Sequence, residues 1–234
     1  MSMFSHIWNF RQAILNDSYG WHFSYLTIIG LSLATATATF GLLADIFSSP
    51  RLFLAKNALS VASAPLEVLI SLLYWSLRTI DPALVMPEWA PPLEMRADLS
   101  FHAVPAIVLA IDLLFLSPPW TIEALPALAL SATTALAYYA WVELCHARNG
   151  FYPYPLFEQL PPAGRIALFV GCAVAMALST AGLKWVYGWV NGATVAKEGE
   201  KPGDVKGKGR RSTGALGERY ERWRREVRGL GIDG

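Results

Sequence analysis

The stretch "FHAVPAIVLAID" at positions 101–112 is apolar enough to lie inside a membrane, although it contains a histidine and ends on an aspartate. A helix needs about 20 predominantly apolar residues to cross the hydrocarbon core of a bilayer. Together with its apolar neighbours, this stretch predicts a span over about residues 99–116. Ionisable side chains are costly in that environment and normally face the interior of a helical bundle. His102 and Asp112 therefore need an explanation.

The rest of the chain repeats the apolar pattern. Of its 234 residues, 54% are hydrophobic and nine are tryptophan, which is typical of a polytopic membrane protein. Further spans are predicted over residues 23–46, 59–77, 122–144 and 166–190. Each span must be helical, because lipid offers the backbone no other hydrogen-bond partner. We therefore expect an all-α transmembrane bundle of about five spans within residues 21–192, or six membrane elements if an amphipathic N-terminal segment, residues 1–20, also inserts.

The end of the chain is basic and poor in apolar residues. Residues 193–234 are expected to be mostly disordered. Within residues 215–230, apolar side chains recur at steps of three and four, which predicts either a short amphipathic helix on a membrane surface or a partly ordered charged tail. Lys and Arg close after a span favour the cytosolic side, so five spans place the N-terminus on the lumenal or outer side. The expected location is the endoplasmic reticulum, another endomembrane or the plasma membrane, with no nucleic-acid partner.

The proline-rich loop and the cysteine and histidine content restrict the structure and the chemistry that the sequence allows. The stretch "RNGFYPYPLFEQLPPAGR" at 148–165 is apolar but holds four prolines, so it cannot form a regular spanning helix and is expected to lie in the interface or dip into a cavity. Cys145 and Cys172 are far apart in apolar surroundings, which argues against a disulfide framework or a zinc site. No histidine pair has ligand spacing, so no metal is expected.

Alternating topology brings Thr27 and His102 near one face, because the first and third spans begin on the same side of the membrane. A hydroxyl and an imidazole at similar depth can form a nucleophile and base pair, although a threonine in a membrane helix often bonds only to its own backbone. Asp98 lies four residues before His102 and can orient the imidazole. Asp112 lies about 15 Å deeper and cannot touch His102 within one helix. Asp112 and Glu67, in the middle of their spans, are either functional or paired between helices.

Several motifs resemble one known family when they are read together. In chain order they are "YLT" at 25–27 with Asp45, "YWSLRTIDPALVMP" at 74–87, the His102 stretch with Asp112, Trp141 with His146, and "YPLFEQLPPAGRI" at 154–166. In this order and spacing, the chain from about residue 25 to 189 resembles the androgen-induced and androgen-dependent membrane proteins.

The resemblance implies hydrolysis of fatty acid esters of hydroxy fatty acids by an intramembrane threonine with a histidine partner and no cofactor. By motif, the threonine is Thr27 and the histidine is His102. The expected partners are membrane lipids and a lipid ester substrate. Tyr154 and Arg165 are candidates for oxyanion donors or for binding the substrate carboxylate, and a guanidinium suits the carboxylate because it can hold both oxygens. Glu67 stands where family members have an apolar residue, so the acyl ester that this protein prefers can differ from theirs.

Two other functions remain open at this stage. One is a non-enzymatic multi-pass protein that binds lipid or a protein partner, whose polar interior serves only packing. The other is a small transporter that uses Glu67 and Asp112 as a proton or ion relay. No internal repeat and no pair of broken helices supports the transporter.

Overall fold

The computed structural model describes residues 18–86, 94–118, 120 and 122–191, and every regular element in these ranges is helical. Four helices are long and apolar enough to cross a membrane: α3 (Leu26–Phe47), α4 (Pro50–Ile80), α7 (Ala124–Asn149) and α9 (Pro162–Val190). Three short helices accompany them: η1 (Trp21–Ser24) precedes α3, η2 (Pro82–Leu84) follows α4, and α8 (Pro155–Gln159) lies between α7 and α9. The expected all-α membrane bundle is confirmed. The expected N-terminal segment up to residue 17 and the tail lie outside the described residues.

The third expected span is broken rather than continuous. It consists of α5 (Met95–His102) and α6 (Val104–Leu116), which meet at an angle of 42°. Pro105 explains the break, because it cannot donate a hydrogen bond to the carbonyl of Phe101 and its ring clashes there. His102 consequently stands at the end of α5, directly before the bend.

The bent pair α5–α6 runs along α4 from one end to the other. Near the end of α4, Arg78 forms an ion pair with Asp98 of α5. Near the start of α4, Lys56 Nζ lies 2.5 Å from Asp112 Oδ2 of α6. Lys56 and Arg78 are separated by about 33 Å of helix, close to the thickness of the hydrocarbon core. We therefore count α5–α6 as one broken span, which makes five.

Helix α4 begins earlier than the sequence predicts. The predicted span started at residue 59, but the helix starts at Pro50 and includes Lys56. Lys56 is polar enough to be excluded from a predicted span, yet its side chain is only 3% exposed because Asp112 neutralises it.

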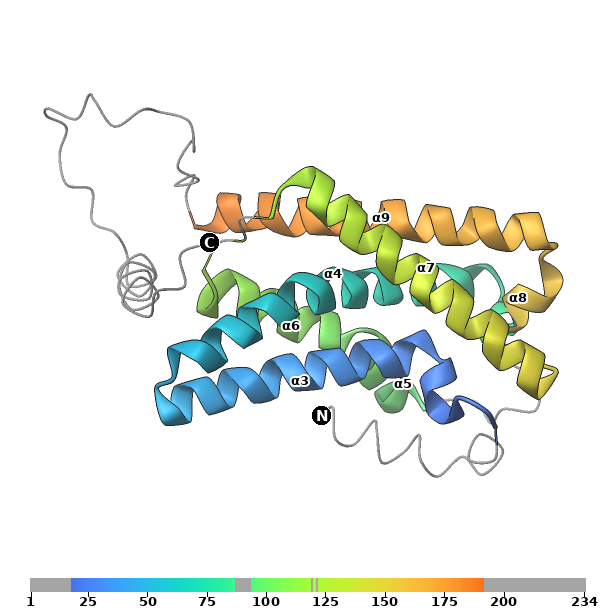
Figure 1. Ribbon diagram of the computed structural model, residues 1–234, viewed down its shortest axis with the longest axis horizontal. Helices are drawn as coiled ribbons and strands as arrows, with labels where there is room; N and C mark the ends of the chain where they lie inside the picture. Colours follow the sequence, from blue (N-terminus) through green and yellow to red (C-terminus); the bar gives the residue numbers. More distant parts are fainter. Residues whose placement is uncertain (1–17, 87–93, 119, 121, 192–234) are drawn as a thin grey trace, which may run out of the picture.

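Helices α3 and α4 pack closely along their small residues. Ala34 and Ala64 are both buried in this interface, and the Thr37 and Ser63 hydroxyls lie 3.0 Å apart. Small residues let membrane helices approach one another. Figure 1 shows α3, α4 and α9 running along the long axis of the molecule, with α7 crossing them obliquely. Residues of α4, α7, α9 and the start of α3 line a common cavity.

Candidate functional site

An apolar cavity occupies the space between these four helices. Its empty volume, with the open mouth included, is about 870 Å³. Its lining includes Thr27 and the predicted loop residue Tyr154, and no charged side chain of the described residues lines it. The segment around α8 thus reaches the cavity, which is one of the two positions expected for it.

The start of α3 is anchored by residues of α7. The Tyr138 hydroxyl accepts a hydrogen bond from the backbone N–H of Leu26 at 3.0 Å and donates one to the carbonyl of Ser24 at 2.9 Å. The indole N–H of Trp141 donates to the carbonyl of Phe23 at 2.9 Å. The bond from Leu26 satisfies an N–H group that a helix start leaves without a partner, and the other two bonds hold the segment before α3 against α7. They also fix the position of Thr27, the second residue of α3.

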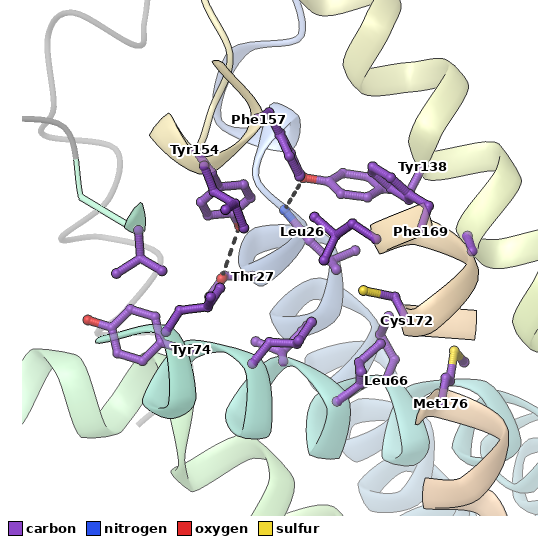
Figure 2. A pocket seen from close by; sticks show the side chains of 18 of the residues that line it. Leu26, Thr27, Leu66, Tyr74, Tyr138, Tyr154, Phe157, Phe169, Cys172 and Met176 are labelled. Atoms are coloured by element: carbon purple, nitrogen blue, oxygen red, sulfur yellow. Dashed lines mark hydrogen bonds between the residues drawn. The ribbon is translucent and has the colours of Figure 1, made fainter. Parts of the chain in front are cut away.

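The hydroxyl of Thr27 faces the cavity and Tyr154. Figure 2 shows the two hydroxyls pointing toward each other, with their oxygens 3.5 Å apart, at the outer limit of hydrogen bonding. Burial raises the pKa of Tyr154, a residue outside the spanning helices, and the hydrogen bond from Thr27 opposes this shift. The Tyr154 phenol therefore stays protonated at neutral pH and can donate a hydrogen bond into the cavity.

His102 is held by a buried network on α4 and α5. Its Nδ1 lies 3.0 Å from Oδ1 of Asp98, the residue four positions earlier. The other carboxylate oxygen of Asp98 pairs with Arg78, which also donates to the Tyr74 hydroxyl at 2.8 Å. The Tyr74 ring stacks on the imidazole with centroids 3.4 Å apart. Because Nδ1–H donates to Asp98, the lone pair of the neutral imidazole lies on Nε2.

Thr27 and His102 lie on packed helices, but His102 does not line the cavity, and no hydrogen bond among the described residues joins the two side chains. Ile28 and Leu31 of α3 form a buried cluster with Ala97 and Phe101 of α5, so the segments that carry both residues pack together. Tyr74 links them, since it lines the cavity with Thr27 and stacks on His102.

Arg165 does not line the cavity. Its Nε donates to Glu143 at 3.1 Å, and its Nη1 donates to the carbonyl of Leu160 at 2.9 Å. The guanidinium also stacks over the ring of Tyr152. These contacts tie the α8 segment to α7 and α9, so the geometry fits a structural role better than carboxylate binding.

Asp112 and Glu67 are also not part of the cavity lining. Asp112 forms an ion pair with Lys56 near the start of α4, far from Arg78, and accepts a hydrogen bond from Ser117. A paired, structural role therefore fits Asp112. Glu67 is 1% exposed and faces Gly30 of α3. Its Oε1 has no hydrogen-bond partner among the described side chains and backbone groups.

Reasoning from the sequence missed Arg78, Tyr74 and Tyr138 as members of this site. Arg78 and Tyr74 lie in the motif "YWSLRTIDPALVMP", four residues apart on one helix face, which was the available signal. Nothing local marks Tyr138, because its partner Leu26 is 112 positions away in the chain.

Comparisons with known proteins agree with this architecture. The family described as FAR-17a/AIG1-like protein matches residues 1–188. The chain is 34% identical over 175 residues to the UPF0641 membrane protein PJ4664.05 of Schizosaccharomyces pombe. The aligned region covers 72% of this chain and 78% of that protein. No solved structure matches the chain. The protein is a multi-pass integral membrane protein and belongs to the FAR-17a/AIG1-like family.

Proposed function

We propose that the protein is an integral membrane hydrolase of lipid esters, with fatty acid esters of hydroxy fatty acids as the substrate class. The observation that carries this proposal is the position of Thr27. Its hydroxyl opens into an apolar cavity beside a helix that holds an imidazole oriented by a buried carboxylate. An acyl chain fits such a lining, and the ester group would lie at the few polar atoms of the cavity.

In the proposed reaction, Nε2 of His102 takes the proton of Thr27 as Oγ1 attacks the carbonyl carbon of the ester. The ester C–O bond breaks, and the leaving hydroxy fatty acid takes the proton from His102. Water, deprotonated by His102, then attacks the carbonyl carbon of the acyl-threonine. The bond from this carbon to Thr27 Oγ1 breaks, Oγ1 takes the proton back from His102, and the fatty acid is released. The Tyr154 hydroxyl, 3.5 Å from Thr27, supplies a donor to the oxyanion. Asp98 orients the imidazole and stabilises its protonated form.

We further propose that the substrate enters from the bilayer of an endomembrane or the plasma membrane, with the basic tail in the cytosol. The cavity lining is mostly apolar, so a two-chain lipid needs no wide aqueous entrance. Under this orientation, the start of α3, with Thr27, and helix α5, which ends at His102, lie toward the lumenal or outer face.

The test is hydrolysis of a fatty acid ester of a hydroxy fatty acid by purified protein in detergent micelles. Thr27→Ala and His102→Ala should each lower kcat by about a thousandfold or more, because each removes one partner of the nucleophile and base pair. Thr39→Ala is the matched control. Thr39 lies on the same helix as Thr27 but outside the cavity lining, and its hydroxyl bonds to the carbonyl of Thr35. Unchanged rates in well-folded Thr27→Ala protein would exclude the proposed nucleophile.

A second function, lipid binding without hydrolysis, is favoured by one observation. The nearest polar partner of the Thr27 hydroxyl is Tyr154, and His102 bonds to Asp98 instead. In that case the protein should bind a fluorescent fatty acid, and a fluorophosphonate probe should leave no adduct on Thr27. An adduct that is found on wild-type Thr27 and lost in His102→Ala would exclude the binding-only function.

A further inference from the structure

The cavity extends to both sides of Thr27. Since α3 and α4 run antiparallel, the start of α3 lies at the level of Tyr74, in the second half of α4. From there, an inner arm leads toward Leu66 of α4 and Met176 of α9 (Figure 2). An outer arm leads toward Leu77 and the loop residues Leu84 and Val85. The Thr27 hydroxyl therefore lies between two apolar arms.

The inner arm has a closed end. Met176 is 2% exposed and packs in one buried cluster with Leu66, Leu69 and Ile70. Cys172, one helical turn before Met176, lines the arm between this end and Thr27 (Figure 2). From Phe169 to Met176 the arm follows α9 for about 10 Å, at a rise of about 1.5 Å per residue.

The inner arm offers no polar partner to a ligand. Three lining residues of α7 bear hydroxyls, Ser131, Thr134 and Tyr138, and each donates to a backbone carbonyl, at 2.8, 2.9 and 2.9 Å. The remaining lining residues of this arm are hydrocarbon, aromatic, thioether or thiol side chains. An unbranched hydrocarbon chain is the ligand whose chemistry matches such a surface.

We infer that the inner arm holds the acyl chain that is transferred to Thr27, and that Met176 sets the longest chain that fits. This inference rests on the proposed function for the transfer step, but the binding of the chain can be tested separately. The hydroxy acid part of the ester then occupies the outer arm. Met176 is suited to end the arm, because its flexible thioether fills irregular space.

The first experiment compares ester substrates of one alcohol, p-nitrophenol, with butanoyl, octanoyl, lauroyl and palmitoyl chains. Met176→Ala should move the best substrate to a longer chain. Met176→Phe should lower kcat/KM for the palmitoyl ester by about tenfold or more and leave the butanoyl ester unchanged. Leu178→Ala is the matched control, because Leu178 lies on the same helix but is 65% exposed and does not line the cavity. Equal chain-length profiles in all four proteins, each folded normally, would overturn the inference.

The second experiment needs no catalysis. In Cys145→Ala protein, Cys172 is the one cysteine left in the chain, so N-ethylmaleimide labels it alone. Palmitate should protect Cys172 from labelling, and Met176→Phe should raise the palmitate concentration for half protection by about tenfold. Octanoate should protect both proteins equally.

The two experiments separate the two claims. If the protein hydrolyses no ester but palmitate still protects Cys172 in a way that depends on residue 176, the proposed reaction is rejected and the acyl-chain site is kept. If Thr27 supports hydrolysis but neither the protection of Cys172 nor the preferred chain length depends on residue 176, the role of Met176 in chain length is rejected and the reaction is kept.

Discussion

The side chains around His102 form a closed ring of contacts. Asp98 joins His102 to Arg78, Arg78 donates to Tyr74, and Tyr74 stacks back on His102. Asp98 is fully buried, so its negative charge is stabilised by its contacts with His102 and Arg78 and not by water. A side chain that is held by a stack and a hydrogen bond cannot rotate freely. The ring therefore keeps the imidazole in one orientation and one tautomer.

Replacing Asp98 with asparagine tests this role. Asp98→Asn keeps the shape but loses the charge, so the imidazole loses the carboxylate that stabilises its protonated form. We expect kcat for lipid ester hydrolysis to fall by about a hundredfold to ten-thousandfold, with a smaller effect on KM.

Asp112→Asn is the matched control for a lost ion pair. Asp112 pairs with Lys56 at the other end of α4, so this change should lower the melting temperature without lowering kcat of the folded protein. A fall in kcat that is equally large in both variants would contradict the assignment of Asp98 as a positioning residue.

Among the helices, the close approach of α3 to α4 decides where Thr27 lies. Gly30, one turn after Thr27, faces Glu67 and Ile70 of α4. A Cβ atom at position 30 would lie 2.6 Å from Ile70 Cδ1 and 2.8 Å from Glu67 Oε1. Both distances are shorter than a normal contact, so any larger residue pushes the two helices apart or forces both side chains to move.

Gly30→Ala should therefore destabilise the bundle by about 1 to 3 kcal/mol and lower activity, because the start of α3 moves with it. Thermal unfolding in detergent, followed by tryptophan fluorescence, measures the change. Gly182→Ala serves as the control, since no atom lies within 4 Å of a Cβ built on Gly182 of α9. A melting temperature in Gly30→Ala that equals that of Gly182→Ala would show that the close approach has no energetic weight.

For the molecule in its membrane, the role of the bent pair α5–α6 fixes the topology. If the pair crosses the bilayer, the loop that contains η2 lies on the side opposite the C-terminus. If it re-enters and returns to the same side, the loop and the C-terminus share a side. The ion pairs at both ends of α4 favour crossing.

Glycosylation acceptors provide the measurement. An Asn-X-Thr acceptor inserted next to η2 and one appended to the C-terminus, in separate variants expressed in eukaryotic cells, report lumenal exposure. We expect modification of the η2 acceptor and none at the C-terminus. Modification of both acceptors, or of the C-terminal one alone, would contradict five spans with a cytosolic tail.

Several features of the fold and site were predictable because they depend on neighbouring residues. Runs of apolar residues predicted the helices, and prolines predicted that residues 148–165 do not cross the membrane. The contact between Asp98 and His102 follows from four-residue spacing on one helix. The break at residue 103 was encoded by Pro105, but an apolar run of sufficient length masked it.

What the sequence determined by itself is the set of membrane helices, because hydropathy and helical periodicity are properties of contiguous residues. Only the tertiary structure decided which polar residues meet. Thr27 faces Tyr154, which lies 127 positions away in the chain. Lys56 and Asp112 form an ion pair although they are also distant in the sequence. The same packing placed Arg165 outside the cavity and Arg78 beside Asp98. The physical reason is that a polar group in lipid takes whichever partner the assembled helices bring within reach, and that choice depends on helix contacts, not on local sequence.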